Sequence, residues 1–309
     1  MRPSSIARVA AFAALSVCAS HLILAQQKPL TRAFVAGAEE RYQVTVAIRV
    51  ETHGVSTEKV GEKAYTQFYT HQGNGQVSWR STRRITAVSS DGVAAVEELL
   101  DHFVADCDKD PTSKSFNAAL QKSVQDTCAG WQTTASMSYQ EEKGGLLGGL
   151  PATSSAVDSD FSLLSLWIRR AFRPSVVLPK TPIEFETRAE HRVGNSSADE
   201  SQPKGEESSE WLESQSETPS AVWHVSQNLR WIDAPNQKVT NMPGGKPQMR
   251  QLFYADSLNT VSLLDGSLLK ASRSATRETK ELLNPVPGLP EAPTFGSRLT
   301  ITVTILRLP

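Results

Sequence analysis

Three stretches of the sequence carry residue types that could do chemistry. Ser56–Lys59 and Ser267–Lys270 both read S-x-x-K, the spacing in which a lysine activates a serine for acyl transfer. The segment Asp106–Asp110 spaces carboxylates like the start of a calcium loop. Neither pattern is complete. No S-D-N or K-T-G motif follows the serines, and Pro111 and Asn117 stand where a calcium loop needs glycine and glutamate.

The histidines give no stronger signal. None of those beyond the N-terminal segment has a second histidine at a ligand spacing: His53, His71, His102, His191 and His224. The motifs H-E-x-x-H, G-x-S-x-G, G-x-x-x-x-G-K and G-x-G-x-x-G do not occur. We therefore predict no catalytic residue, no metal and no cofactor. A hydrolase of unfamiliar type is the alternative, and it needs a histidine and a carboxylate within hydrogen-bond reach at a cavity mouth.

The first residues predict export. Arg2 and Arg8 precede the apolar run 9–19, which is shorter than the roughly 20 apolar residues of a spanning helix. We predict a signal peptide over residues 1–25, cleaved after Ala25, with Ala19 as the alternative site. A lipoprotein signal, with lipid attached at Cys18, is the other reading. The mature protein is then periplasmic or secreted.

Composition limits what the exported chain can bind. No later stretch is apolar for long enough to predict a transmembrane span. The net charge of −1 gives no basic patch for nucleic acid. Cys107 and Cys128 remain after the signal is removed, and two cysteines in an oxidising compartment predict a disulfide. A catalytic thiol or metal ligation are the alternatives.

Alternating apolar and polar residues predict strands along most of the chain. The clearest is 40–52, in which Tyr42, Val44, Val46, Ile48 and Val50 share one face. Further strands are predicted at 64–70, 77–89, 133–142, 175–193, 221–232, 251–264, 267–283 and 297–308. Apolar spacing of helical type predicts helices at 116–131 and 158–172. Residues 93–107 fit either a helix or a returning strand.

Together these elements predict an α+β fold, mostly antiparallel β. We expect a curved sheet or half-barrel with two or three packed helices. Residues 26–193 form a first β-rich half with the helices, and 221–309 form a second β-rich half of the same unit. Between them, residues 194–220 are rich in serine and acidic residues and predict a disordered loop, or a hairpin tip between strands.

Two Asp-Gly pairs predict tight hairpin turns, since glycine accepts a positive φ. Asp91-Gly92 and Asp265-Gly266 each lie between two strand-like stretches. This similarity is architectural and leaves an internal duplication open.

The order of these parts resembles a loose group of uncharacterised secreted bacterial β-rich proteins with paired Asp-Gly hairpins. The matching stretches are ERYQVTVAI, SSDGVAAVEE, VVLPKTPIEF and LLDGSLLKAS. The predicted bent sheet with a few helices is also similar to the half-barrel of periplasmic lipoprotein carriers, a likeness of fold that transfers no site.

These expectations favour an exported, non-catalytic envelope protein. Its concave sheet would bind a lipid or other apolar ligand, or an envelope protein partner. Trp223 and Trp231 share one strand face, and Phe161 and Trp167 lie on the apolar face of the helix predicted at 158–172, so these four are the candidate ligand-binding residues. The alternative is a structural or assembly module that pairs through its edge strands.

Overall fold

A computed structural model describes residues 29–60, 63–107, 122, 126, 136–149, 170–194, 203–214, 218–233, 248–282 and 296–309. For residues 55–60, 63–69, 107, 233, 248, 281 and 282 the description covers the backbone alone.

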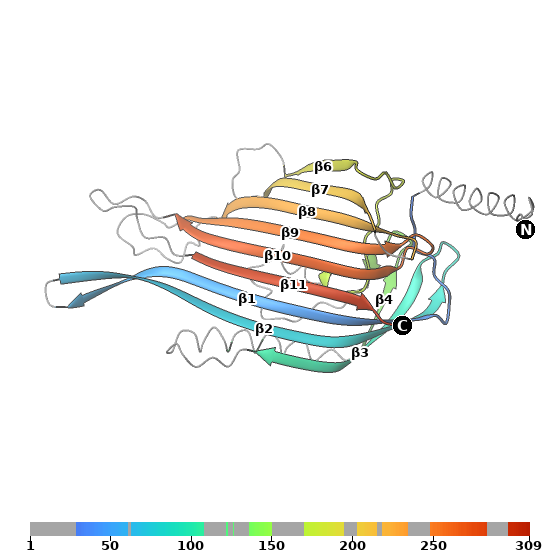
Figure 1. The fold of residues 1–309 in the computed structure, drawn as a ribbon, viewed down its shortest axis with the longest axis horizontal. Coiled ribbons are helices and arrows are strands. Elements are labelled where there is room, and N and C mark those ends of the chain that lie inside the picture. Colours follow the sequence, from blue (N-terminus) through green and yellow to red (C-terminus); the bar gives the residue numbers. More distant parts are fainter. Residues whose placement is uncertain are drawn as a thin grey trace, which may run out of the picture.

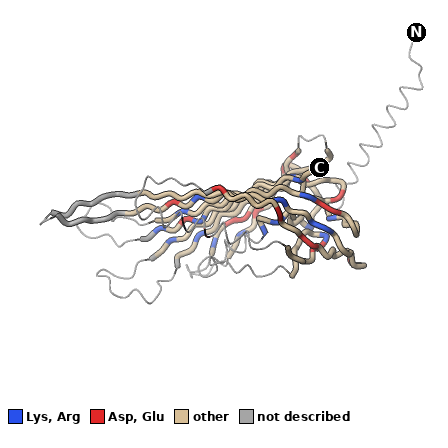
Figure 2. The backbone as a smooth tube through the Cα atoms, turned by 90° about the horizontal axis from the view of Figure 1, so that it is seen from below, with Lys and Arg blue, Asp and Glu red and all other residues tan. Residues whose placement is uncertain are grey.

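One antiparallel sheet of 11 strands makes up most of the described chain (Figure 1). Its strands are β1 (Glu39–Val60), β2 (Lys63–Val88), β3 (Ala94–Cys107), β4 (Ser136–Glu141), β5 (Leu147–Gly148), β6 (Arg188–Val193), β7 (Lys204–Glu213), β8 (Ser220–Asp233), β9 (Gln248–Ser262), β10 (Leu268–Leu282) and β11 (Gly296–Arg307). Their order across the sheet is β5-β4-β3-β2-β1-β11-β10-β9-β8-β7-β6. Two meanders therefore meet at the pairing of β1 with β11. Seen edge-on, the strands form a thin, twisted layer (Figure 2).

The predicted α+β class is wrong, because the described residues form almost entirely antiparallel strands. Residues 94–107 form β3, so the strand interpretation of 93–107 is the correct one. The helix predicted at 116–131 lies outside the described residues except for positions 122 and 126. Most of the helix predicted at 158–172 lies outside them as well, and only its end is seen, where residues 170 and 171 are helical.

The disordered loop predicted at 194–220 is also wrong over its centre, where residues 204–213 form β7. Serine and glutamate are tolerated here because β7 has strands on both sides but only one face against the core. Trp211 is the buried anchor of this strand, with 3% of its surface exposed. Its aromatic ring stabilises a strand whose other residues are mostly polar.

The inner face of the sheet holds the core. Tyr42, Val44 and Val46 of β1 are fully buried, as the alternation predicts. The register places residues of the same kind beside them on the neighbouring strands: Val77 and Trp79 of β2, and Ile301, Val303 and Ile305 of β11. Side chains of successive residues point to opposite faces of a strand, so the intervening residues form an outer face.

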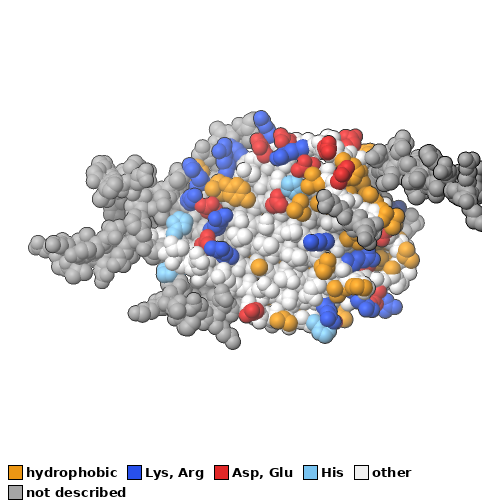
Figure 3. Space-filling model, in the orientation of Figure 1, with side chains coloured by type: hydrophobic (Ala, Val, Ile, Leu, Met, Phe, Trp, Pro, Cys, Tyr) orange, Lys and Arg blue, Asp and Glu red, His pale blue; other side chains and the backbone are white. Residues whose placement is uncertain are grey.

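The outer face is polar. Serine and threonine dominate where β10 and β11 pair, namely at Ser272, Ser274, Thr276, Thr300, Thr302 and Thr304. The hydroxyls of Thr276 and Thr300 are 3.1 Å apart and share a hydrogen bond. Figure 3 shows this face, with its central part white because few charged or hydrophobic side chains reach it.

Both Asp-Gly pairs form hairpin turns. Gly92 has φ of 83° and joins β2 to β3, and Gly266 has φ of 67° and joins β9 to β10. In each case glycine occupies a backbone conformation that other residues adopt at a cost.

An irregular segment, residues 170–178, lies against the inner face, and we call it the strap. Ala171, Val176 and Leu178 of the strap are buried in the core. The turn between β4 and β5 holds its far end, because the Leu178 amide donates to the Gly144 carbonyl at 2.9 Å. The strap therefore covers part of the inner face of the sheet.

Candidate functional site

Buried charged side chains of the sheet fasten the strap. Arg83 of β2 is 1% exposed and donates through Nη1 to the Pro174 carbonyl at 2.9 Å. The same guanidinium binds Glu40 Oε2 at 2.9 Å and also pairs with Glu141 Oε2. Its Nε donates to the Tyr139 hydroxyl at 2.9 Å. Opposite charges surround this guanidinium, so its pKa lies well above the usual value even though burial acts to lower it.

Arg32 completes this network from the segment that precedes β1. It is 3% exposed and pairs with Glu40 Oε1 at 2.9 Å and with Glu141 Oε1 at 3.4 Å. Two arginines and two glutamates are thus buried together, and attraction to Arg32 and Arg83 lowers the pKa of Glu40 against the effect of burial. Charges compensated in this way indicate a structural network.

A third anchor, Arg273 of β10, holds the beginning of the strap. Its Nη1 donates to the carbonyls of Arg170, Ala171 and Arg173 at 3.2, 2.9 and 3.0 Å. Its Nη2 donates to the Ser175 carbonyl at 2.5 Å, and its Nε donates to Asn259 Oδ1 at 2.8 Å. The carbonyls of 170–173 end a helical turn, where partial negative charge suits a guanidinium.

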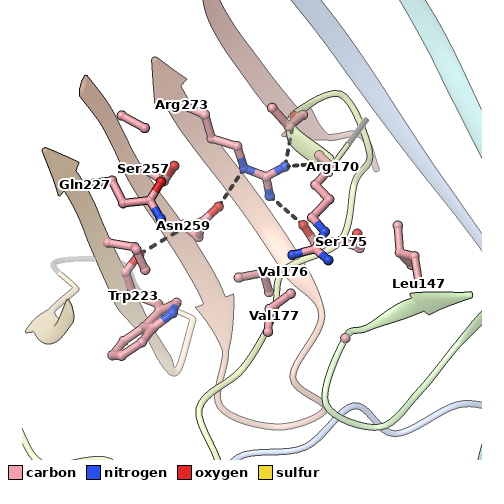
Figure 4. Close-up of a pocket in the computed structure, with 14 residues that line it drawn as sticks. Leu147, Arg170, Ser175, Val176, Val177, Trp223, Gln227, Ser257, Asn259 and Arg273 are labelled. Atoms are coloured by element: carbon pink, nitrogen blue, oxygen red, sulfur yellow. Dashed lines mark hydrogen bonds between the residues drawn. The ribbon is translucent and has the colours of Figure 1, made fainter. Parts of the chain in front are cut away.

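Between the strap and strands β8, β9 and β10 lies a cavity of about 320 Å³. Its apolar lining comes from Leu147, Ala171, Val176, Val177, Trp223, Val225 and Ala255, and its polar lining from Arg170, Ser175, Gln227, Ser257, Asn259 and Arg273. In Figure 4 the side chains of Arg273, Asn259, Gln227 and Ser257 lie above those of Val176, Val177 and Trp223. Polar and apolar side chains therefore share the lining of this cavity.

Gly145 lets the β4–β5 turn approach the strap and close the cavity on that side. Its φ is 76°, and a Cβ added there would overlap the Val176 carbonyl oxygen. Glycine is required for both reasons.

Trp223 is one of the residues predicted to bind a ligand, and it does line this cavity. Its ring packs on that of Trp211, with centroids 4.8 Å apart, and its carbonyl accepts from Asn259 Nδ2 at 3.3 Å. Trp231 is partly buried against the core farther along β8 and is not among the lining residues. The structure therefore does not bring these two together.

The remaining predicted residues lie beyond what is described. Phe161 and Trp167 fall in 150–169, and Cys128 falls in 127–135. Cys107 ends β3, where the backbone alone is described. The disulfide therefore stays a prediction, as do the two aromatic side chains.

Neither Arg273 nor Arg83 was predicted from the sequence, although a signal existed. Arg273 lies between Ala271 and Ala275, which are buried on the inner face, while the serines between them point outward. Arg83 similarly shares a face with Ser81 and Ile85. A charged residue at an inward-facing position of a strand is uncommon and marks a buried partner.

The S-x-x-K pattern at Ser267 has a structural explanation. The Ser267 hydroxyl donates to Asp265 Oδ1 at 2.7 Å and accepts from Arg307 Nη1 at 2.7 Å, while Lys270 is exposed on β10. This serine shapes the turn, and no lysine activates it.

One histidine does lie within reach of carboxylates, on the outer face. His224 Nδ1 is 3.0 Å from Glu210 Oε1, and His224 Nε2 is 2.9 Å from Asp256 Oδ2. These hydrogen bonds raise the pKa of His224, against the lowering effect of its partial burial. Because both ring nitrogens are occupied, the imidazole links β7, β8 and β9 and has no free nitrogen to act as a general base.

Nothing in the described part of the chain positively indicates catalysis. Within those residues, no three His, Cys, Asp or Glu side chains converge to hold a metal ion. No helix there is both long and apolar enough to cross a bilayer.

Comparison with known proteins adds little to this geometry. No family model matches the chain, and no curated protein is similar to it. Among solved structures, OccAB4 of Acinetobacter baumannii aligns with 88% of this chain and 99% of its own, at 8% identity and a TM-score of 0.18. OccK7 (OpdD) and OpdQ of Pseudomonas aeruginosa align at 8% and 7% identity, covering 88% and 87% of this chain and 100% and 98% of their own. Their TM-scores are 0.19 and 0.16, and likenesses this weak carry no argument.

Proposed function

We propose that this is an exported, non-catalytic binding protein of the cell envelope, which holds a small apolar ligand between its strap and its sheet. The observation that supports this most directly is the cavity of about 320 Å³, walled by Trp223, Val176 and Val177. Ligand sites are concave, mostly apolar and carry a few polar groups. The volume is at the lower end of the range of about 300–1,000 Å³ for such sites, so a single short chain fits better than a two-chain lipid.

Export rests on the sequence of residues 1–25, a positive start followed by a short apolar run. We propose binding without chemistry because the described lining residues include no nucleophile paired with a base.

The assembly alternative has less support. The strand β6 lies at one edge of the sheet, and five of its six residues are exposed, including Arg188, Glu190 and Arg192. Charged side chains on an edge strand oppose pairing with another strand.

The test is uptake of a neutral apolar probe by the mature chain. We expect N-phenyl-1-naphthylamine to gain fluorescence on binding and decanol to displace it. Val225→Phe, inside the cavity, should weaken uptake at least tenfold. Leu258→Phe, on the outer face of the next strand, is the matched control and should leave uptake unchanged. Absence of uptake by the wild-type chain, or equal loss in both variants, would refute the proposal.

A further inference from the structure

The charges of the cavity indicate what kind of apolar ligand it takes. Arg273 is 6% exposed and lines the cavity, yet no carboxylate of the described residues pairs with it. Its partners are the Asn259 amide oxygen and four strap carbonyls, all of them neutral. A buried charge normally has a partner of opposite sign, so this guanidinium is an exception.

Arg83 is a control within the same molecule. Both guanidinium groups are buried on the inner face, but Arg83 binds Glu40 and Glu141. The pKa of Arg83 is raised well above its usual value, whereas burial alone lowers the pKa of Arg273 to about 10. Among the described residues, two carboxylates compensate the charge of Arg83, whereas Arg273 contacts only the dipoles of neutral groups.

Arg273 also keeps one hydrogen-bond donor in reserve. A guanidinium has five N–H donors, one on Nε and two on each terminal nitrogen. Nη1 serves three strap carbonyls, while Nη2 serves only Ser175. One Nη2 hydrogen therefore has no acceptor among the residues that the structure describes.

A second cation also lines the cavity. Arg170 is exposed, lines the cavity and extends toward it beside Ser175 in Figure 4. None of the described residues that line the cavity is acidic. Two positive charges beside apolar walls create a positive potential that water screens only in part.

We infer that the ligand is a single-chain acid, with its carboxylate at Arg170 and Arg273 and its apolar chain against Trp223, Val176 and Val177. A carboxylate accepts hydrogen bonds from the spare donor of Arg273 and from the fork of Arg170, and charge-assisted bonds of this kind are the strong ones. It also supplies the negative charge that Arg273 lacks. This inference rests on the proposed function, because it assigns the head group of the ligand in the same cavity.

The experiment compares three ligands with the same chain length. Decanoate, decanol and decyltrimethylammonium each displace N-phenyl-1-naphthylamine from the wild-type mature chain at neutral pH and low salt. We expect decanoate to bind at least tenfold more tightly than decanol, and decyltrimethylammonium to bind most weakly. The preference for decanoate should shrink as salt is added, because Arg170 is exposed and its charge is screened.

Arg170→Gln is the test variant, because Arg273 also holds the strap and its loss changes the fold. We expect Arg170→Gln to weaken decanoate three- to tenfold and to leave decanol unchanged. Arg80→Gln, at an exposed arginine on the outer face, is the matched control and should change neither. If decanol binds as well as decanoate, or Arg170→Gln affects both alike, the inference that the ligand is an acid is refuted, while the proposed binding of an apolar ligand is retained. If none of the three binds, the proposed function fails.

Discussion

Replacing Arg273 with methionine tests the role of this buried guanidinium in holding the strap. The substitution keeps a long side chain of similar reach but removes every donor. Three buried groups then lose their hydrogen-bond donor: the carbonyls of Ala171 and Ser175 and the side chain of Asn259, which are 4%, 8% and 4% exposed.

The size of the effect follows from two opposing terms. A buried acceptor left without a donor costs about 2 kcal/mol, so three cost about 6 kcal/mol. Removing an uncompensated buried charge gives back part of this. Burial lowers the pKa of Arg273 from its usual value to about 10, and at 1.36 kcal/mol for each pKa unit the relief is roughly 3 kcal/mol. The expected loss in the free energy of unfolding is therefore about 3 kcal/mol.

Urea unfolding followed by far-UV circular dichroism measures the global loss, and hydrogen exchange locates it. We expect the Leu178 amide, which bonds to Gly144, to exchange about a hundredfold faster. The exchange rates of amides in β1 and β11 should change only as far as the global free energy of unfolding changes. Arg80→Met, at an exposed arginine, is the control. Unchanged exchange across 170–178 together with a stability change under 0.5 kcal/mol would refute the role assigned to Arg273.

Three further predictions concern other anchors of the same sheet. Gly145→Ala should cost about 2 kcal/mol or more and speed exchange in the strap, because φ is positive and the Cβ overlaps Val176. Gly149→Ala, with φ of 71° and open space around it, should show the backbone cost alone, so equal losses in urea unfolding would contradict the overlap. Arg83→Met should cost about 3–5 kcal/mol, since it leaves buried carboxylates short of a partner. Adding Glu141→Gln should restore part of that loss, and a strictly additive double variant would show that the two side chains are not coupled. The His224 pKa is raised in the folded state, so its pairing contributes stability that is full below the unfolded pKa of about 6.5 and is lost as pH rises through the folded value. NMR titration should place the pKa of this imidazole above its usual value, and the stability difference between wild type and His224→Asn should shrink toward alkaline pH. A folded pKa at or below the usual value would contradict the pairing of His224 with Glu210 and Asp256.

Periodicity of two predicted the strands well where one face is uniformly apolar. Tyr42, Val44, Val46 and Ile48 alternate without interruption, and all four are buried in β1. Residues 94–107 were ambiguous because their alanine, glutamate and leucine content suits a helix, and pairing with β2 and β4 overrode that preference. Residues 204–213 were misjudged because their serine and glutamate suggest disorder, whereas hydrogen bonds to β6 and β8 and one buried tryptophan order them.

Only part of the candidate site could be predicted from the sequence. Trp223 was selected from its strand face and lines the cavity. Trp231 is on the same face but lies farther along β8, beyond Gln227, the last residue of that strand to line the cavity. The strap and Arg273 are about a hundred residues apart along the chain, and only the folded sheet brings them together. Alternation could show that Arg273 points inward, but it could not show that the strap carbonyls accept its hydrogen bonds.

The pairing of β1 with β11 has a consequence for how the chain acquires its structure. Twelve residue pairs, from Tyr42 with Arg307 to His53 with Gly296, join the two meanders at the middle of the sheet. A ribosome or translocon releases β1 long before β11, so the central seam closes only when nearly all of the polypeptide is available. Contacts of such long range slow folding. Until then the backbone groups of β1 and β11 that face each other in the sheet are unpaired, and holding chaperones bind chains in such a state.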